Sequence, residues 1–151
     1  MQNNPDFKEF FESFNTHKVR YVVVGAYAVM HHTEPRATLD IDVLVDTSPE
    51  NARAVMAALT AFGFGSIGLT ETDFSKPAQT VQLGYPPNRI DILTSITGVG
   101  FEEAYAHRQP SDYDGVPIDY LGVDQLLRNK EATARDKDLL DVKRLRKLRP
   151  S

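Results

Sequence analysis

The sequence predicts an α/β domain in which a mixed β-sheet is flanked by helices. Short runs rich in valine and isoleucine, such as residues 20–24, alternate with longer stretches whose apolar residues recur at helical spacing, such as residues 51–62. The length of 151 residues suits one domain with one hydrophobic core. We therefore expect a single domain over residues 1–151, with an N-terminal helix in 1–18, an α/β core in 20–120 and C-terminal helices in 122–148.

The N-terminal segment predicts an amphipathic helix that packs on the core. Its four phenylalanines lie three or four residues apart or side by side on one helical face: Phe7, Phe10, Phe11 and Phe14. A buried strand follows at residues 20–24, Gly25 ends it, and residues 26–32 can form two turns of helix. The next strand runs to about Val45, after which a Ser48-Pro49 start predicts a helix over residues 51–62.

The second half of the chain predicts a hairpin and a helical C-terminus. Residues 66–76 have no firm prediction, whereas 79–84 and 89–94 read as two strands joined by a turn at 85–88. A short helix over 98–106 and a turn at 112–115 precede a strand at 116–120, and helices fill residues 124–148. The expected order is α-β-α-β-α-β-β-α-β-α-α.

Composition narrows the function classes. The chain has no cysteine, which excludes disulfides, thiolate metal sites and cysteine nucleophiles. Its net charge of −4 gives no overall attraction to nucleic acid, although a local basic patch would still be compatible with it. No stretch approaches the ~20 apolar residues of a membrane helix, and the first residues lack a basic start or an apolar run. We expect a cytoplasmic protein with no membrane contact.

Two aspartates at spacing i, i+2 are the main chemical signal. Asp40 and Asp42 lie in a predicted strand, so their side chains point the same way while Ile41 and Val43 face the core. Adjacent carboxylates repel each other, and a divalent cation such as Mg²⁺, which prefers oxygen ligands, offsets the repulsion. An Asp-x-Asp pair alone is also common on a solvated strand face.

Asp91 adds a third carboxylate on a later strand. Ile90 and Ile92 share the inner face of that strand, which leaves Asp91 on the outer face. We predict that Asp40, Asp42 and Asp91 lie in one cleft, with carboxyl oxygens close enough to share a cation, and that mutual repulsion raises the pKa of at least one. Three such carboxylates can hold two Mg²⁺ ions about 3.5–4 Å apart, as in enzymes of phosphoryl or nucleotidyl transfer.

A strand, a glycine and a helix precede the acidic pair. The helix that starts after Gly25 presents backbone N–H groups and the positive end of its dipole, which suit triphosphate oxygens. There is no glycine pattern at the spacing of a dinucleotide site.

The run from Val22 to Val43, with its glycine-led turn, short helix, Pro-Arg-Ala-Thr and Asp-x-Asp, resembles the signature of the DNA polymerase β-like nucleotidyltransferase superfamily. It is most similar to a small bacterial branch related to AbiEii-type and minimal nucleotidyltransferases. The strand 89–94 and the segment 129–142 resemble that branch as well, so the resemblance covers roughly residues 20–148. It implies a nucleotidyltransferase fold and the transfer of NMP from an NTP to a hydroxyl group.

The resemblance also implies roles for individual residues. Asp40, Asp42 and Asp91 fall on the metal ligands, for two Mg²⁺ ions that Mn²⁺ could replace, and Asp91 also on the general base. Gly25 and Ala26 fall on the phosphate-facing turn. Ala26 departs from the usual Gly or Ser: it adds a methyl group and lacks a hydroxyl, which argues against tight triphosphate binding.

Three basic residues are candidates for contact with the triphosphate. Arg36 either grips phosphate oxygens or pairs with a neighbouring carboxylate. Lys130 and Lys137, in the predicted C-terminal helices, either face the triphosphate across the cleft as a cationic wall or belong to a solvated charged surface. Asp138 and Asp141 are expected to orient the basic residues or to cap the packing of these helices, rather than to bind metal.

Several hypotheses remain open about function. In the leading one, a nucleotidyltransferase modifies a tRNA, a protein or a small molecule, as part of a toxin–antitoxin or phage-defence pair with a cognate toxin or antitoxin partner. The alternative is a catalytically degenerate module of the same fold that binds a nucleotide or a partner. A metal phosphohydrolase is a third hypothesis, but the histidines that often join such sites are lacking.

Overall fold

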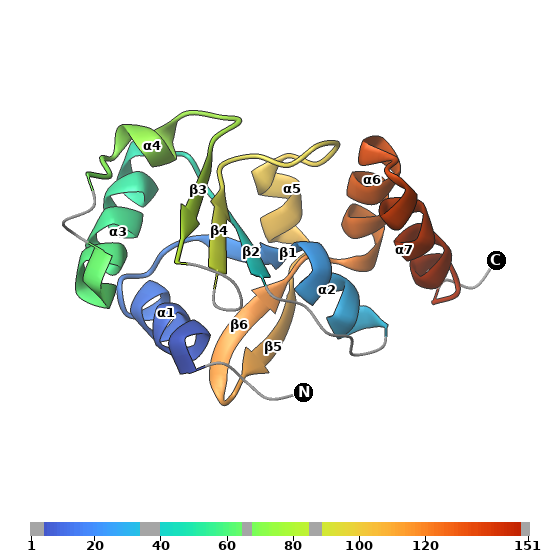
Figure 1. Cartoon of the computed structure of the whole chain (residues 1–151), viewed down its shortest axis with the longest axis horizontal. Helices are drawn as coiled ribbons and strands as arrows, with labels where there is room; N and C mark the ends of the chain where they lie inside the picture. The colour runs from blue at the N-terminus through green and yellow to red at the C-terminus, as the bar shows by residue number, and fades with distance from the viewer. Residues whose placement is uncertain (1–4, 34–39, 65–67, 85–88, 149–151) are drawn as a thin grey trace.

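The computed structural model describes residues 5–33, 40–64, 68–84 and 89–148, which form an α+β fold around one mixed sheet (Figure 1). The six strands lie in the order β3-β4-β2-β1-β6-β5. Their bounds are β1 (Tyr21–Val24), β2 (Asp40–Val45), β3 (Thr80–Leu83), β4 (Arg89–Leu93), β5 (Gln109–Tyr113) and β6 (Val116–Tyr120). The predicted fold class is confirmed.

The centre of the sheet combines parallel and antiparallel pairs. β2 is parallel to β4 and antiparallel to β1, and β1 is parallel to β6. The hairpins β3–β4 and β5–β6 complete the two edges. The arrangement places β2 and β4, which carry the three aspartates of the predicted site, side by side.

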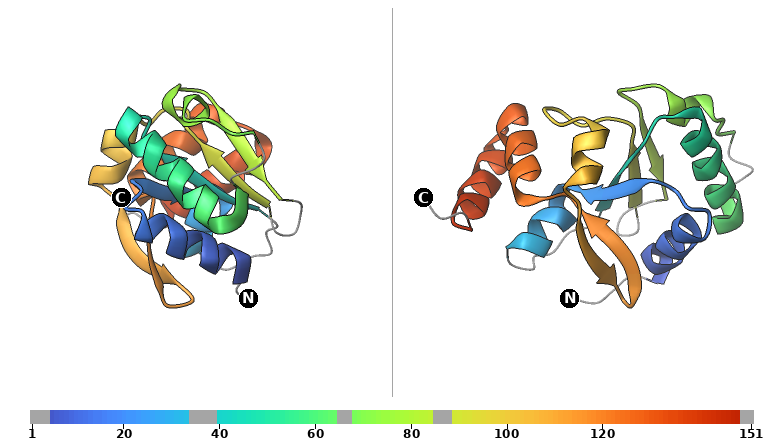
Figure 2. Two further views of the ribbon diagram at one scale, coloured as in Figure 1. Left: turned by 90° about the vertical axis from the view of Figure 1, so that its left-hand side faces the viewer. Right: turned by 180° about the vertical axis from the view of Figure 1, so that it is seen from behind.

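Two pairs of helices lie at opposite ends of the molecule, and further helices lie between them (Figures 1 and 2). Helices α1 and α3 pack together at one end, and α6 and α7 form a pair at the other. Their bounds are α1 (Pro5–Thr16), α2 (Gly25–His32), α3 (Pro49–Leu59) with the π-helical η1 (Thr60–Phe64), α4 (Thr72–Ser75), α5 (Phe101–Ala106), α6 (Val123–Thr133) and α7 (Asp136–Arg146). Ser48 caps α3 by accepting a hydrogen bond from the Asn51 backbone N–H, as its sequence predicts.

The two faces of the sheet have different roles. The face that carries Tyr21, Ile41 and Ile92 packs against α1, whose phenylalanine stripe is buried as predicted. The side chains of Asp40 and Asp42 alternate with Ile41 and Val43 along β2 and therefore belong to the opposite face. Buried apolar side chains lie on both faces of the central strands, since Val22, Val24 and Leu44 share the face of Asp42. The acidic side chains occupy one part of that second face.

The structure corrects the predicted order of elements at two places. Residues 109–113 form β5, where the sequence led us to expect only a turn at 112–115, and the hairpin turn lies at Asp114-Gly115. Pro110 and Asp112 disfavour a strand, but β5 is an edge strand, where proline is tolerated. The second addition is α4, a short helix that buries Phe74. The predicted turn at 85–88 lies outside the described residues.

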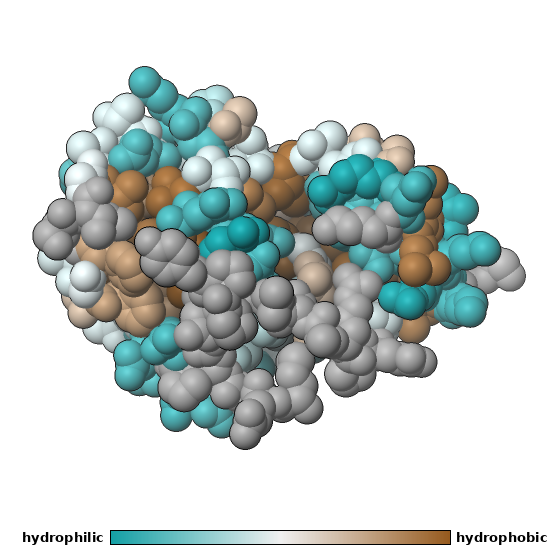
Figure 3. Space-filling model, viewed as in Figure 1, coloured by the Kyte–Doolittle hydropathy of each residue, from teal (hydrophilic) through white to brown (hydrophobic). Residues whose placement is uncertain are grey.

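Exposed large apolar side chains occur on the C-terminal helices and just after them. Among the described residues, the large apolar side chains that remain about half exposed are Leu139, Leu140 and Leu148. Figure 3 shows apolar patches next to hydrophilic side chains over these helices. Within the described part of the chain, no helix has the length and apolar character needed to cross a bilayer.

Candidate active site

The three predicted aspartates lie on neighbouring strands. Asp40 and Asp42 are on β2 and Asp91 is on β4, and Asp42 pairs directly with Asp91 in the parallel register. Side chains of paired residues lie on the same face of a sheet, so the carboxylates of Asp42 and Asp91 are neighbours. Asp91 is buried, whereas Asp40 and Asp42 are partly exposed. The structure therefore brings the three carboxylates to one face.

A guanidinium group lies among these carboxylates. Arg89, which precedes Asp91 by two residues on β4, donates from Nη2 to Asp40 Oδ2 at 2.7 Å. Its Nε donates to Asp91 Oδ1 at 3.0 Å and its Nη2 to Asp91 Oδ2 at 3.1 Å. Arg89 thus bridges two of the three carboxylates, and nearby carboxylates raise its own pKa, Asp91 foremost.

The pKa of Asp42 is raised, as expected for a carboxyl group that is buried beside other carboxyl groups. Burial raises its pKa to about 6, and the charge of Asp91 and a hydrogen bond with it act in the same direction. Asp40 contributes less, and Lys130 opposes the shift. The predicted rise is confirmed, with burial as its largest cause and repulsion as the second.

The chemical type of the ligand atoms in this cluster suits a hard divalent cation. The ligands offered are carboxylate oxygens, which Mg²⁺ and Mn²⁺ prefer, and the crowding of Asp42 and Asp91 is relieved by positive charge. Among the residues described, no three acidic or histidine side chains are arranged to hold a metal ion as they stand. Metal binding therefore requires Asp40 and Asp91 to adjust, and Arg89 holds both of them.

The turn between β1 and α2 lies directly against Asp42. Gly25 begins α2 with a φ of +68°, a conformation that L side chains rarely adopt. A Cβ atom at this position would overlap the Asp42 carboxylate. Glycine is thus required here both by the backbone and by the approach of Asp42, and Ala26 follows it on the wall of the adjoining cavity.

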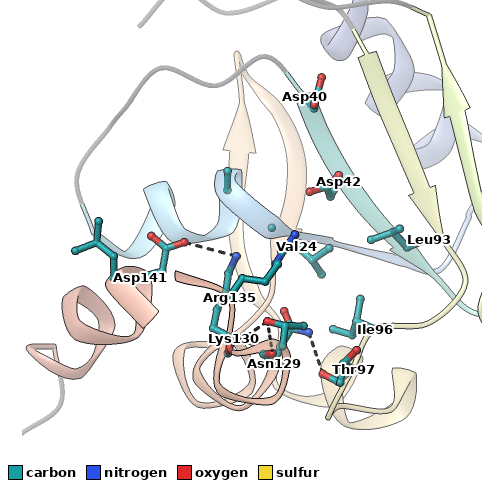
Figure 4. A pocket seen from close by; sticks show the side chains of 14 residues that line it. Val24, Asp40, Asp42, Leu93, Ile96, Thr97, Asn129, Lys130, Arg135 and Asp141 are labelled. Carbon is teal, nitrogen blue, oxygen red and sulfur yellow. Dashed lines mark hydrogen bonds and ion pairs between the residues drawn. The ribbon is translucent and has the colours of Figure 1, made fainter. Parts of the chain in front are cut away.

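A cavity of about 500 Å³ separates β2 from the C-terminal helices. Figure 4 shows Asp40 and Asp42 on one side of it and Asn129, Lys130 and Arg135 on the other. The remaining lining residues are Val24, Gly25, Ala26, Leu93, Ile96, Thr97, Thr133, Leu140 and Asp141. Its size lies within the range of small-molecule sites in proteins.

Lys130 lines this cavity, but two neighbouring carboxylates offset the positive charge of its ammonium group. Its ammonium lies 3.2 Å from Asp138 Oδ1 and 3.6 Å from Asp141 Oδ2, and its side chain is only 8% exposed. The alternative of a solvated surface lysine is therefore wrong for Lys130. The expectation that Asp138 and Asp141 orient basic residues is confirmed.

Asp138 is the centre of this second cluster. Burial alone would raise its pKa, but hydrogen bonds from Arg135, Thr133 and Lys130 hold the pKa of this carboxyl well below its usual range. Arg135 Nε donates to Asp138 Oδ2 at 2.7 Å while its side chain stays 63% exposed. Arg135 is therefore the cavity-wall cation that solvent reaches most easily in this cluster.

Two predicted residues cannot be placed in the site. Arg36 lies outside the described residues, and so does the side chain of Lys137, whose backbone belongs to α7. Conversely, sequence reasoning did not assign Arg89 and Arg135 to the site. The position of Arg89 could have been predicted from the sequence, because a residue two positions from Asp91 in a strand lies on the same face of the sheet.

Comparison with known proteins adds no assignment, because no protein-family model and no curated protein sequence matches the chain. The function must therefore be inferred from the residues and geometry of the site.

Proposed function

We propose that the chain is a metal-dependent nucleotidyltransferase that moves NMP from an NTP to a hydroxyl acceptor. The observation that carries the proposal is the meeting of Asp42 with Asp91 across β2 and β4, with the Gly25 turn packed directly against Asp42. This arrangement places clustered carboxylates, which favour a divalent cation, beside backbone N–H groups that suit phosphate oxygens.

In this proposal Asp40, Asp42 and Asp91 hold Mg²⁺, two ions in the full complex, and Mn²⁺ can take their place. When bound, the metal supplies activation of the attacking oxygen and stabilisation of the charge on the leaving pyrophosphate. Asp91 accepts the proton of the acceptor hydroxyl. The hydroxyl oxygen bonds to the α-phosphorus while the bond from that phosphorus to the bridging oxygen breaks, and pyrophosphate leaves.

Both walls of the cavity offer groups that suit phosphate oxygens. The backbone N–H groups at Gly25 and Ala26 are assigned to oxygens of the triphosphate, and the guanidinium of Arg135 to those of the leaving pyrophosphate. Lys130, with two aspartates as partners, contributes positive potential and holds the wall in place. An acidic protein needs such local positive charge to admit an anionic nucleotide.

The test is transfer of label from NTPs carrying ³²P at the α-phosphate, with Mg²⁺ present. Total RNA, total protein and the chain itself serve as acceptors, and nucleotide binding is measured in parallel by calorimetry. We expect labelled product and pyrophosphate with the wild-type chain and loss of both in Asp42→Asn. Asp119→Asn is the matched control, because Asp119 is also a strand carboxylate paired with an arginine. Absence of both binding and transfer in the wild-type chain would contradict the proposal.

A degenerate nucleotide-binding module is the second candidate. The observations that favour it are the methyl group of Ala26 on the cavity wall and the engagement of both Asp91 oxygens by Arg89. The same experiment separates the two, since a module of this kind binds Mg²⁺ and NTP but releases no pyrophosphate. A toxin or antitoxin partner is compatible with either candidate. The acceptors tested, RNA and protein, bear only on the nucleotidyltransferase candidate.

A further inference from the structure

The contacts of Arg89, on β4, differ from those of Arg108, which directly precedes β5. Its guanidinium engages both oxygens of Asp91 and one oxygen of Asp40, at 2.7–3.1 Å. Arg108, by contrast, pairs with the single carboxylate of Asp119, at 3.1 Å, and stacks on Tyr105. Both side chains are about one-third exposed. What sets Arg89 apart is that its two partners are the candidate metal ligands.

The charges around Arg89 do not balance. Three carboxylates lie on this face against one guanidinium, so the cluster keeps an excess of negative charge when all are ionised. The excess attracts a cation, but both oxygens of Asp91 and one oxygen of Asp40 already accept hydrogen bonds from Arg89. A divalent ion and a guanidinium on the same oxygens repel each other, so both cannot hold them at full strength.

We propose that Arg89 is a positioning residue that serves as the built-in counter-cation of the acidic site. Its guanidinium holds Asp40 and Asp91 together in the metal-free protein and leaves their oxygens when a divalent cation binds. This inference rests on the proposed function, because it takes the three carboxylates as the metal ligands. A metal ion must therefore displace the guanidinium of Arg89 from these oxygens, and this displacement costs part of the free energy of metal binding.

The exchange predicts opposite effects of one substitution. Removal of the guanidinium in Arg89→Gln leaves the carboxylates to repel each other, which destabilises the metal-free protein. The same change frees the oxygens and removes a competing charge, so the metal binds more tightly. By linkage, a saturating metal then stabilises the variant more than it stabilises the wild-type chain. A merely structural arginine would lower stability equally with and without metal.

The experiment uses Mn²⁺ as the probe, without nucleotide. Its dissociation constant is measured by electron paramagnetic resonance, and thermal unfolding is followed with chelator and with saturating Mn²⁺. The variants are Arg89→Gln, Arg89→Lys, which keeps the charge but loses the two-pronged contact, and Asp42→Asn. Arg108→Gln is the matched control, since it breaks a single arginine–aspartate pair away from the acidic face.

We expect Arg89→Gln to bind Mn²⁺ about tenfold more tightly than the wild-type chain, a typical size for coupling between two ligands of one site. Arg89→Lys should fall between them, and it keeps the inference testable if the glutamine variant does not fold. Arg108→Gln should leave the dissociation constant unchanged. Equal or weaker Mn²⁺ binding in both Arg89 variants would overturn the counter-cation role while leaving the metal site intact. No saturable binding in any variant, or binding that Asp42→Asn does not weaken, would overturn the metal site itself and with it the proposed function.

Discussion

Two clusters of charged side chains face each other across the cavity, and they differ in balance. On the sheet, Asp40, Asp42 and Asp91 share one arginine, and the pKa of Asp42 is raised to about 6. On the helices, Lys130 and Arg135 offset Asp138 and Asp141, and the pKa of Asp138 is lowered. In the helical cluster the acidic and basic side chains offset each other's charge. In the sheet cluster the carboxylates still repel each other, and an added cation would relieve that repulsion.

The comparison teaches that acidic residues beside one cavity need not share a role. A buried carboxylate that receives hydrogen bonds from three side chains, as Asp138 does, is built to hold a helix pair together. A carboxylate that is crowded by its neighbours, as Asp42 is, costs stability where it stands and is better explained by a ligand.

The largest expected effect is on the helical cluster. Asp138→Asn removes the charge that pairs with Lys130, which is almost fully buried, and should lower the free energy of unfolding by about 3 kcal/mol. Urea unfolding measures the change. Asp119→Asn is the control and should cost less than about 1 kcal/mol, because its partner Arg108 is partly solvated. A loss below that of the control would show that the helical cluster is not structural.

The next effect concerns the contact between Gly25 and the sheet cluster. Gly25→Ala forces a Cβ atom into the Asp42 carboxylate at a positive φ and should cost about 1–3 kcal/mol of stability. Nucleotide binding should fall as well, since Asp42 must move. Gly100→Ala is the control, because a Cβ atom there meets open space without a positive φ. Equal unfolding midpoints for the two variants would contradict the close packing of the turn on Asp42.

A smaller effect distinguishes the two clusters by pH. The pKa of Asp42 rises from its ordinary value of 3.8 to about 6 on folding, so the folded protein binds this proton more tightly than the unfolded chain does. The resulting stabilisation is complete below pH 3.8 and is lost as the pH rises through 6. At pH 8, Asp42→Asn should therefore be more stable than the wild-type chain in metal-free buffer. The pKa shift sets an upper limit of about 3 kcal/mol, and the partial exposure of Asp42 makes the gain smaller.

The measurement is urea unfolding of the two proteins at pH 4 and pH 8. Near pH 4 their free energies of unfolding should be close, because Asp42 is then mostly protonated in the folded state. A wild-type chain that is the more stable of the two at pH 8 would mean that charged Asp42 has a favourable partner and that the sheet cluster is structural too.

Local patterns in the sequence predicted most of the fold. The period of two in Asp40-Ile41-Asp42 and in Arg89-Ile90-Asp91 gives the correct face for each aspartate, since alternation along a strand is a local property. Strand β5 was missed, because its stability comes from pairing with β6 and its own residues disfavour a strand.

The charge partners could be predicted only in part. We expected Asp138 and Asp141 to orient basic residues, but the burial of Lys130 between them depends on α7 folding back beside α6, which the spacing of these residues does not reveal. The bridge from Arg89 to Asp40 likewise depends on β4 lying next to β2. Tertiary contacts of this kind decide which charges are balanced, and therefore which carboxylates are available to a ligand.

The central claim is that the sheet cluster, and not the helical one, binds the cation. A crystal grown with Mn²⁺ and a non-hydrolysable NTP analogue tests it most directly, because manganese gives an anomalous signal. We predict anomalous peaks beside the carboxylates of Asp42 and Asp91, with the triphosphate between the Gly25 turn and Arg135. Peaks at Asp138 and Asp141, or nucleotide density with no peak at Asp42, would contradict the account.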